Sequence, residues 1–207
     1  MTPRDVDRPS DPSWISDGDG AHDRTLVETW LFQLRRERFR SRASGKVHDF
    51  FVAHLADGVH VIAVTGEQQV VLVRQFRAGP RRDCLETPGG LLEPGEDPCA
   101  AGARELLEET GYAGDPAERL GTLWPNPALL TMGITTIVIK NARRVAEPRP
   151  DPSEELAVEL VPVQEIPALI QSGRIDHAVV VAGLLSWLML EGARPSQAPR
   201  DRVSWNR

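Results

Sequence analysis

The chain has 207 residues, of which 41% are hydrophobic and 26% charged, and its 24 basic and 30 acidic side chains give a formal net charge of -6 at pH 7. This length and composition are typical of one globular domain with short additions, large enough to bury a core without disulfide bonds. The negative charge argues against non-specific binding to nucleic acid, so no nucleic-acid partner is expected.

Both ends of the chain are rich in residues that cannot build a core. Asp, Pro, Ser and Gly dominate residues 1–24, and residues 193–207 are similar, so we expect mobile tails around a domain of residues 25–192. No apolar run is long enough to cross a membrane and no signal peptide opens the chain, so we predict a cytoplasmic protein without a membrane partner. Cys84 and Cys99 are interpreted as thiols of a reducing compartment, with a disulfide between them as the alternative.

The first third of the domain is expected to be β structure. Val27 to Leu34 is an apolar segment that can form a strand, and the basic run RRERFR follows it. The strands expected beyond that run are residues 49–55, 59–65 and 70–76. The first two of these are expected to join as a hairpin through the turn at Asp57 and Gly58.

A loop and a helix come next. Residues 89–96 contain Gly and Pro and form the expected loop. Asp97 and Pro98 are an N-cap and first-turn pair, so the helix is expected to begin there. Gly111 is a suitable residue for its C-terminal end.

The second half of the domain mixes strands and helices. Expected strands are residues 132–139 and 156–161, separated by an acidic, Pro-rich loop at 146–155, and expected helices are residues 166–171 and 176–191. Asp176 is expected to cap the second of these helices and Gly192 to end it. Strands and helices do not alternate regularly, which favours an α+β fold with a mixed sheet and helices packed on it.

Residues 89–112 read GGLLEPGEDPCAAGARELLEETGY and place Glu96, Glu105, Glu108 and Glu109 around one turn and helix. Three of them, Glu105, Glu108 and Glu109, share one face of the expected helix. A helix turns by about 100° per residue, so these carboxylates lie within one turn and repel one another. One interpretation is a solvated acidic face with an Arg104 to Glu108 ion pair. The other is a site for a hard divalent cation such as Mg²⁺, which prefers carboxylate oxygens together with water and phosphate.

This segment resembles the Nudix box, G-x5-E-x7-R-E-U-x-E-E-x-G-U, in which U is a bulky aliphatic residue. The matching positions are Gly90, Glu96, Arg104, Glu105, Leu106, Glu108, Glu109 and Gly111, and Tyr112 stands at the last aliphatic position. The stretches VVLVRQFR, CLETPGG and TLWPNPALLTM extend the resemblance over residues 25–192. They are similar to the branch of pyrophosphatases that act on ADP-ribose and nucleoside diphosphate sugars.

The resemblance implies a fold and an activity. The fold would be the α+β Nudix fold, a mixed β-sheet sandwiched between helices, with an N-terminal antiparallel β extension at residues 25–56 that pairs in a homodimer. The activity would be Mg²⁺-dependent hydrolysis of the diphosphate of ADP-ribose or a related nucleoside diphosphate sugar, with Mn²⁺ as the other candidate ion. Products would be a nucleoside monophosphate and a sugar phosphate. Alternatives are another nucleoside diphosphate derivative, such as a dinucleoside polyphosphate, coenzyme A or capped RNA, or a ligand-sensing Nudix module without catalysis.

The resemblance also implies roles for the residues of the box. Metal ligands would be Glu105, Glu109, Glu108 and the carbonyl group of Gly89. Arg104 and Glu96 would orient these carboxylates, and Arg104 and Glu108 would thereby also belong to the catalytic set.

Outside the box, Arg77, Glu86 and Pro127 match positions near the substrate, and Arg77 would contact phosphate through its planar guanidinium. A surface ion pair is the alternative role for Arg77. The general base would be Glu154 or Glu155, in the loop before the strand at 156–161, because the box carboxylates are occupied by metal. Three aromatic residues are interpreted as buried, with stacking on a nucleobase as the alternative: Trp30, Phe32 and Trp124.

Overall fold

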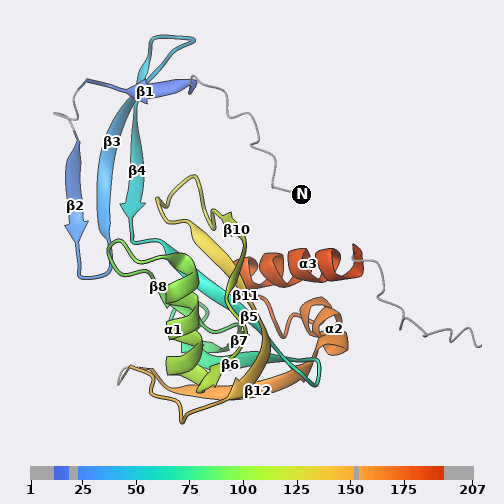
Figure 1. Cartoon of the computed structure of the whole chain (residues 1–207). Helices are drawn as coiled ribbons and strands as arrows, with labels where there is room; N and C mark the ends of the chain where they lie inside the picture. The colour runs from blue at the N-terminus through green and yellow to red at the C-terminus, as the bar shows by residue number, and fades with distance from the viewer. Residues whose placement is uncertain (1–11, 19–22, 152–153, 194–207) are drawn as a thin grey trace, which may run out of the picture. The chain divides into compact units, whose positions relative to one another are not determined.

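The computed structural model describes residues 12–18, 23–151 and 154–193 (Figure 1). The chain forms two compact units, the first made of Met1–Gly58 with Trp124–Ile134 and the second of Val59–Leu123 with Thr135–Arg207. Within the described ranges, no helix is long and apolar enough to cross a bilayer.

The first unit contains an antiparallel sheet. Its strands are β1 (Trp14–Ser16), β2 (Arg24–Glu28), β3 (Gln33–Ser41) and β4 (Val47–His54). β3 pairs with each of the other three strands, so it is the centre of the sheet. The antiparallel β extension predicted for residues 25–56 is therefore confirmed.

The strand expected from Val27 to Leu34 is wrong, because the chain turns at residues 29–32. The Thr29 side-chain oxygen accepts hydrogen bonds from the backbone N–H groups of Leu31 and Phe32, at 3.2 and 3.0 Å. This local side-chain contact competes with an extended backbone and makes a tight turn between β2 and β3. The basic run that follows, to which no element was assigned from the sequence, forms the central strand β3.

The tail expected for residues 1–24 is wrong where β1 forms. Trp14 pairs in register with Ser41, and its ring packs edge-to-face on His48 and Phe50, each at 5.3 Å between ring centroids. Aromatic pairing of this kind anchors a short strand that composition alone would leave unstructured. The rest of that tail, residues 1–11 and 19–22, and most of the expected C-terminal tail lie outside the described residues.

The second unit contains a mixed sheet of eight strands with the order β10-β11-β5-β6-β12; of the other three strands, β7 pairs with β6, β8 with β5 and β9 with β11. Its strands are β5 (Gly58–Thr65), β6 (Gln69–Arg77), β7 (Arg82–Glu86), β8 (Gly89–Leu91), β9 (Tyr112–Ala113), β10 (Glu118–Leu123), β11 (Ile134–Arg144) and β12 (Leu156–Pro162). Its helices are α1 (Pro98–Thr110), the 3-10 turn η1 (Val163–Glu165), α2 (Ile166–Gln171) and α3 (Ala178–Ala193).

The hairpin expected between residues 49–55 and 59–65 is wrong, since β4 and β5 belong to different sheets. The Asp57 carboxylate does not close a tight turn but accepts a hydrogen bond from the backbone N–H of Gly133, at 2.8 Å. That partner lies 76 residues further along the chain, so the local Asp-Gly pattern gave a turn signal that a distant contact overrides.

Helices cover both faces of the second sheet, as predicted. In β5, Ile62 and Val64 join the core cluster that contains residues of α2 and α3, whereas Val61 and Ala63 join the cluster that contains residues of α1. Side chains alternate between the faces of a strand, so β5 is buried from both sides. Each fully buried Val, Ile or Leu stabilises the fold by about 1.5–3 kcal/mol, which makes this sheet the rigid part of the molecule.

The ends of α1 follow the sequence signals. The Asp97 carboxylate accepts hydrogen bonds from the backbone N–H groups of Cys99 and Ala100, and Gly111 ends the helix in the left-handed conformation with φ of 73°. The expected cap of α3 is wrong. His177 lies at its N-terminus, with Nδ1 3.5 Å from the Val180 nitrogen, and Asp176 forms an ion pair with Arg82 instead.

Candidate active site

The carboxylates of α1 differ in burial. Glu109 is only 2% exposed, the Glu105 side chain is 15% exposed, and the Glu108 side chain is 48% exposed. The apolar side chains of α1, such as Leu106, anchor one side of the helix in the core. The exposure of these carboxylates therefore increases from Glu109, which is buried, through Glu105 to Glu108, which reaches solvent.

The backbone of β8 lies directly against the two buried carboxylates. A Cβ atom added to Gly90 would lie 2.4 Å from Oε1 of Glu105, so no larger residue fits there without moving the carboxylate. The backbone N–H of Gly89 donates to Oε2 of Glu109 at 3.0 Å. The double glycine thus lets the main chain approach both acids closely.

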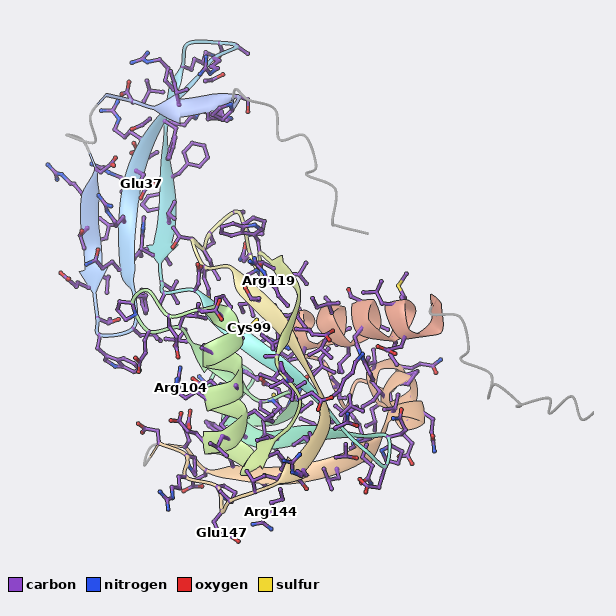
Figure 2. All side chains as sticks on the ribbon, in the orientation of Figure 1. Glu37, Cys99, Arg104, Arg119, Arg144 and Glu147 are labelled. Atoms are coloured by element: carbon purple, nitrogen blue, oxygen red, sulfur yellow. The ribbon has the colours of Figure 1, made fainter. Side chains whose placement is uncertain are left out.

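Arg104, which is labelled beside α1 in Figure 2, forms hydrogen bonds with three acids of the same segment. Its Nε and Nη2 donate to the two carboxylate oxygens of Glu96 at 2.9 and 3.0 Å, and its Nη1 donates to Glu105 at 2.9 Å and to Glu108 at 3.1 Å. The hydrogen bonds from Arg104 lower the pKa of Glu96, and Glu96 in turn raises the pKa of Arg104. Arg104 and Glu96 are therefore placed to orient the neighbouring carboxylates.

Burial disfavours the charged forms of the two inner carboxylates, Glu105 and Glu109. It raises the pKa of Glu109 to about 8, with the charges of Glu105 and Glu154 adding to the rise and the Gly89 hydrogen bond and Arg77 opposing it. Burial also raises the pKa of Glu105, against the effect of Arg104. A bound cation would hold both groups in their charged form.

The loop before β12 brings Glu154 near these acids. The charge of Glu154 is among the causes of the raised pKa of both Glu105 and Glu109. Two hydrogen bonds join Glu154 to Asp151: the Glu154 nitrogen donates to the Asp151 oxygen at 2.8 Å, and Oε2 of Glu154 accepts from the Asp151 nitrogen at 3.2 Å. Glu154 and its neighbour Glu155 are both exposed.

Arg77 and Glu86 form a paired unit beside Glu109. Nε and Nη2 of Arg77 donate to Oε1 and Oε2 of Glu86 at 3.0 and 2.8 Å. Glu86 is 2% exposed and uses both oxygens on this pair, so it is placed to hold Arg77 rather than to touch a substrate directly. The Arg77 side chain remains 42% exposed.

The remaining predicted positions belong to the first unit. Pro127 is exposed there, so its substrate contact stays a prediction. Trp30 is 92% exposed and Trp124 is half exposed, so the expectation of buried rings is wrong for both, while Phe32 is half-buried.

The sequence analysis missed one polar cluster next to the site. His60, Thr87 and Thr136 are all buried, and the His60 ring lies within hydrogen-bond distance of both hydroxyl groups. The available signal was a single imidazole within the apolar strand GVHVIAVT.

Carboxylate oxygens such as those of Glu105 and Glu109 are the ligand type that divalent cations, Mg²⁺ among them, prefer. Among residues 12–18, 23–151 and 154–193, no three carboxylate, imidazole or thiol side chains converge closely enough to hold an ion alone. Protein Mg²⁺ sites ordinarily use one or two carboxylates, completed by water and substrate phosphate. Glu105 and Glu109, with the Gly89 backbone beside them, match that pattern, and the raised pKa of Glu109 marks the negative charge that an ion would balance.

Known proteins resemble this chain along most of its length. The sequence model of the NUDIX domain matches residues 54–184. A mouse (Mus musculus) protein named ADP-sugar pyrophosphatase is 34% identical over 157 residues, which cover 70% of this chain and 72% of that protein. An ADP-ribose pyrophosphatase of Bacillus subtilis is 29% identical over 170 residues, covering 74% and 91%. A crystal structure of an ADP compounds hydrolase shares the fold, with a TM-score of 0.72 at 20% identity over 83% of this chain and 94% of that one.

Proposed function

The chain belongs to the Nudix family, and we propose that it is a Mg²⁺-dependent pyrophosphatase that hydrolyses the diphosphate bond of ADP-ribose or a related nucleoside diphosphate sugar. The observation that carries the proposal is the buried pair Glu105 and Glu109, held against the glycine backbone of β8. Such a pair is costly to bury unless a cation binds it.

The substrate class is supported by the relatives. The mouse and Bacillus proteins are named for ADP-sugar and ADP-ribose pyrophosphatase activity, and both align over more than two thirds of this chain. Hydrolysis of ADP-ribose at its diphosphate gives AMP and ribose 5-phosphate. An acidic protein that binds an acidic substrate needs local positive charge, and a cation together with Arg77 would supply it.

Glu105 and Glu109 would hold the ion, with Glu108 and the Gly89 carbonyl as further ligands. When bound, Mg²⁺ neutralises phosphate charge and lowers the pKa of a coordinated water. Arg104 keeps Glu105 in place through its hydrogen bond at 2.9 Å, and its second contact reaches Glu108. Orientation of ligands by such partners is typically worth 10- to 100-fold in metal affinity or activity.

Arg77 would bind the diphosphate. Glu86 occupies Nε and Nη2 of its guanidinium, which fixes the plane of the group, while the exposed part of the side chain is free to meet a phosphate oxygen. A prepositioned guanidinium loses little conformational freedom on binding. The ion pair and the phosphate contact are therefore compatible roles for Arg77.

Glu154 would act as the general base. A base must accept the proton of the attacking water, and the carboxylates on the metal are poor acceptors. Glu154 lies outside α1, and its charge is among the causes that raise the pKa of Glu105 and Glu109, which supports its choice as the base. Glu155, one residue nearer to β12, is the alternative base.

A homodimer through the first unit completes the proposal. Several large apolar side chains are exposed on its sheet and on the turn between β2 and β3: Leu26, Val27, Trp30, Leu31 and Phe51. An exposed group of this size is typical of an interaction surface. The family resemblance supports a second copy of the chain as the partner.

The test is a substrate panel. Purified protein with Mg²⁺ is incubated with ADP-ribose, other nucleoside diphosphate sugars, dinucleoside polyphosphates and coenzyme A, and products are identified by mass spectrometry. We expect ADP-ribose or another nucleoside diphosphate sugar to give the highest kcat/KM, with AMP and ribose 5-phosphate as the products from ADP-ribose. Preference for a polyphosphate or coenzyme A would reject the substrate class, and no hydrolysis of any compound would reject the activity.

A further inference from the structure

The strand β5 carries a buried imidazole, that of His60, between the apolar residues Val59 and Val61. His60 is 5% exposed, and every residue of β5 is buried. Its Nδ1 lies 2.8 Å from the Thr87 hydroxyl and its Nε2 lies 2.7 Å from the Thr136 hydroxyl. An apolar residue would fill this position without needing partners, so the imidazole calls for a reason beyond packing.

Thr87 belongs to the segment that links the phosphate-binding pair to the metal ligands. Glu86, just before it, holds Arg77 at 2.8 and 3.0 Å. Two residues after it, the backbone N–H of Gly89 donates to Glu109 at 3.0 Å. The position of residues 86–89 therefore determines where the Arg77 guanidinium and the Glu109 carboxylate lie.

The same segment is pressed onto β5 at His60. The Val61 nitrogen donates to the Pro88 oxygen at 2.8 Å. A Cβ atom added to Gly89 would lie 2.7 Å from the Cα of His60, so the two backbones are in direct contact. The imidazole of His60 adds the one side-chain tie between β5 and this segment among the hydrogen bonds of the described residues.

The His60 ring also packs against α3. Gly183 of α3 leaves no room for a side chain, since an added Cβ would lie 2.5 Å from Cε1 of His60 and 3.1 Å from the Thr136 hydroxyl. Burial lowers the pKa of His60 to about 4, with His177 adding to the effect and Glu86 opposing it, so the ring is neutral at pH 7. A neutral imidazole has one donor and one acceptor, and threonine hydroxyls can complement either tautomer.

We propose that His60 is a positioning residue of the active site, which acts through Thr87 to hold residues 86–89 in the place where Glu86 orients Arg77 and Gly89 contacts Glu109. It reaches the segment from the α3 side of the sheet, opposite to the face that packs on α1. This inference deepens the proposed function and rests on it for the link to hydrolysis.

The two threonines separate positioning from plain structural support. Thr87→Val and Thr136→Val each remove one hydroxyl, keep the shape of the side chain and leave one imidazole nitrogen without its partner. Both hydroxyls are buried, so the two variants should lose similar stability. Only Thr87 lies in the segment that carries Glu86 and Gly89.

The experiment measures Mn²⁺ binding by electron paramagnetic resonance on each purified protein without substrate, and kcat/KM for ADP-ribose with Mg²⁺. We expect Thr87→Val to weaken Mn²⁺ binding and kcat/KM by about 10-fold, and Thr136→Val to change either by less than about 3-fold. Thr87→Ser keeps the hydroxyl and should retain binding close to that of the wild type. Thermal unfolding checks that all variants are folded.

Equal effects of the two valine substitutions on Mn²⁺ binding would overturn the proposal, because His60 would then act only on stability. A Thr87→Ser protein that binds Mn²⁺ about 10-fold more weakly than the wild type would overturn it too. Because this comparison is made with the wild type, it holds even if Thr87→Val does not fold. If the wild type hydrolyses neither ADP-ribose nor another nucleoside diphosphate sugar, the proposed function fails, but the Mn²⁺ comparison still tests the positioning role.

Discussion

The two strands β5 and β3 both lie inside their sheets, but their side chains differ. All eight residues of β5 are buried between helical layers, whereas none of the nine residues of β3 is buried. β3 carries four arginines, and Arg36, Arg38 and Arg40 are paired with the carboxylates of Asp17 or Asp49.

This difference separates what each region can do. Half-exposed ion pairs typically contribute less than about 1 kcal/mol each, so β3 is held by many weak contacts and keeps apolar neighbours exposed. The buried β5 sheet fixes its side chains tightly, which catalysis requires of the groups that position metal and phosphate. The proposed chemistry therefore belongs to the β5 sheet and its flanking elements, and the proposed contact with a second copy to the unit that contains β3.

The largest expected effect comes from the loop that reaches the β5 sheet. Glu154→Gln should lower kcat by about 100-fold or more at saturating Mg²⁺ and flatten the acidic limb of the pH profile, because the base is lost. Glu155→Gln removes the same charge one residue away and should change kcat by less than about 3-fold. If Glu155→Gln has the larger effect, Glu155 is the base. If neither variant differs from the wild type, the base lies elsewhere.

A smaller effect is expected within β6, where two arginines form comparable ion pairs. Arg77→Lys should reduce kcat/KM by about 10- to 30-fold, because lysine cannot hold Glu86 and phosphate in one plane. Arg74→Lys, which changes the partner of Glu159, is the matched control and should stay within about 2-fold of the wild type. Equal kinetics for the two variants would leave Arg77 as a surface ion pair only.

A substitution in the unit that contains β3 should weaken the proposed dimer. Trp30→Ser removes a ring that is 92% exposed at the turn between β2 and β3, and should weaken the dimer by about 10-fold or more. Met189→Ser removes a side chain that is 74% exposed on α3 and should leave the dimer unchanged. Light scattering at micromolar concentration measures both, and a fully active wild-type monomer would contradict the assignment.

The smallest expected effect is on stability without metal. The pKa of Glu109 is raised from 4.5 to about 8, so the stability it contributes is complete below pH 4.5 and is lost as the pH rises through about 8. Glu109→Gln avoids that loss. In EDTA its Tm should match the wild type near pH 4 and exceed it by about 5 °C at pH 9, as measured by calorimetry. A wild type that is the more stable protein at pH 9 in EDTA would show that the charged carboxylate is already balanced.

The local signals of the sequence predicted the helix that carries the site. Asp97, Pro98 and Gly111 act through neighbouring atoms, so a reader of the sequence can place the ends of α1 from them. The spacing of Arg104, Glu105 and Glu109 on one helix follows in the same way. The ends of α1 and the spacing of its charged residues were therefore predictable, because neighbouring residues determine both.

Features that depend on distant partners were not predictable. The Asp-Gly pattern predicts a turn at Asp57, but its carboxylate accepts a hydrogen bond from Gly133. The sequence predicts no element for the basic run of β3, whose counter-charges, Asp17 and Asp49, lie in other parts of the chain. His60 gave no site signal because its meaning comes from Thr87, 27 residues away. One sequence does not show which of its distant residues meet.

The most direct test of the central claim follows ADP-ribose by phosphorus-31 NMR with wild type, Glu109→Gln and Glu93→Gln proteins. Glu93 is exposed near the same helix and provides a control with the same loss of charge. We predict that the wild type and Glu93→Gln produce AMP and ribose 5-phosphate with Mg²⁺ and neither product in EDTA. Glu109→Gln should be slower by about 100-fold or more. Hydrolysis that persists in EDTA, or a Glu109→Gln rate equal to the wild type, would contradict a metal-dependent site on the buried sheet.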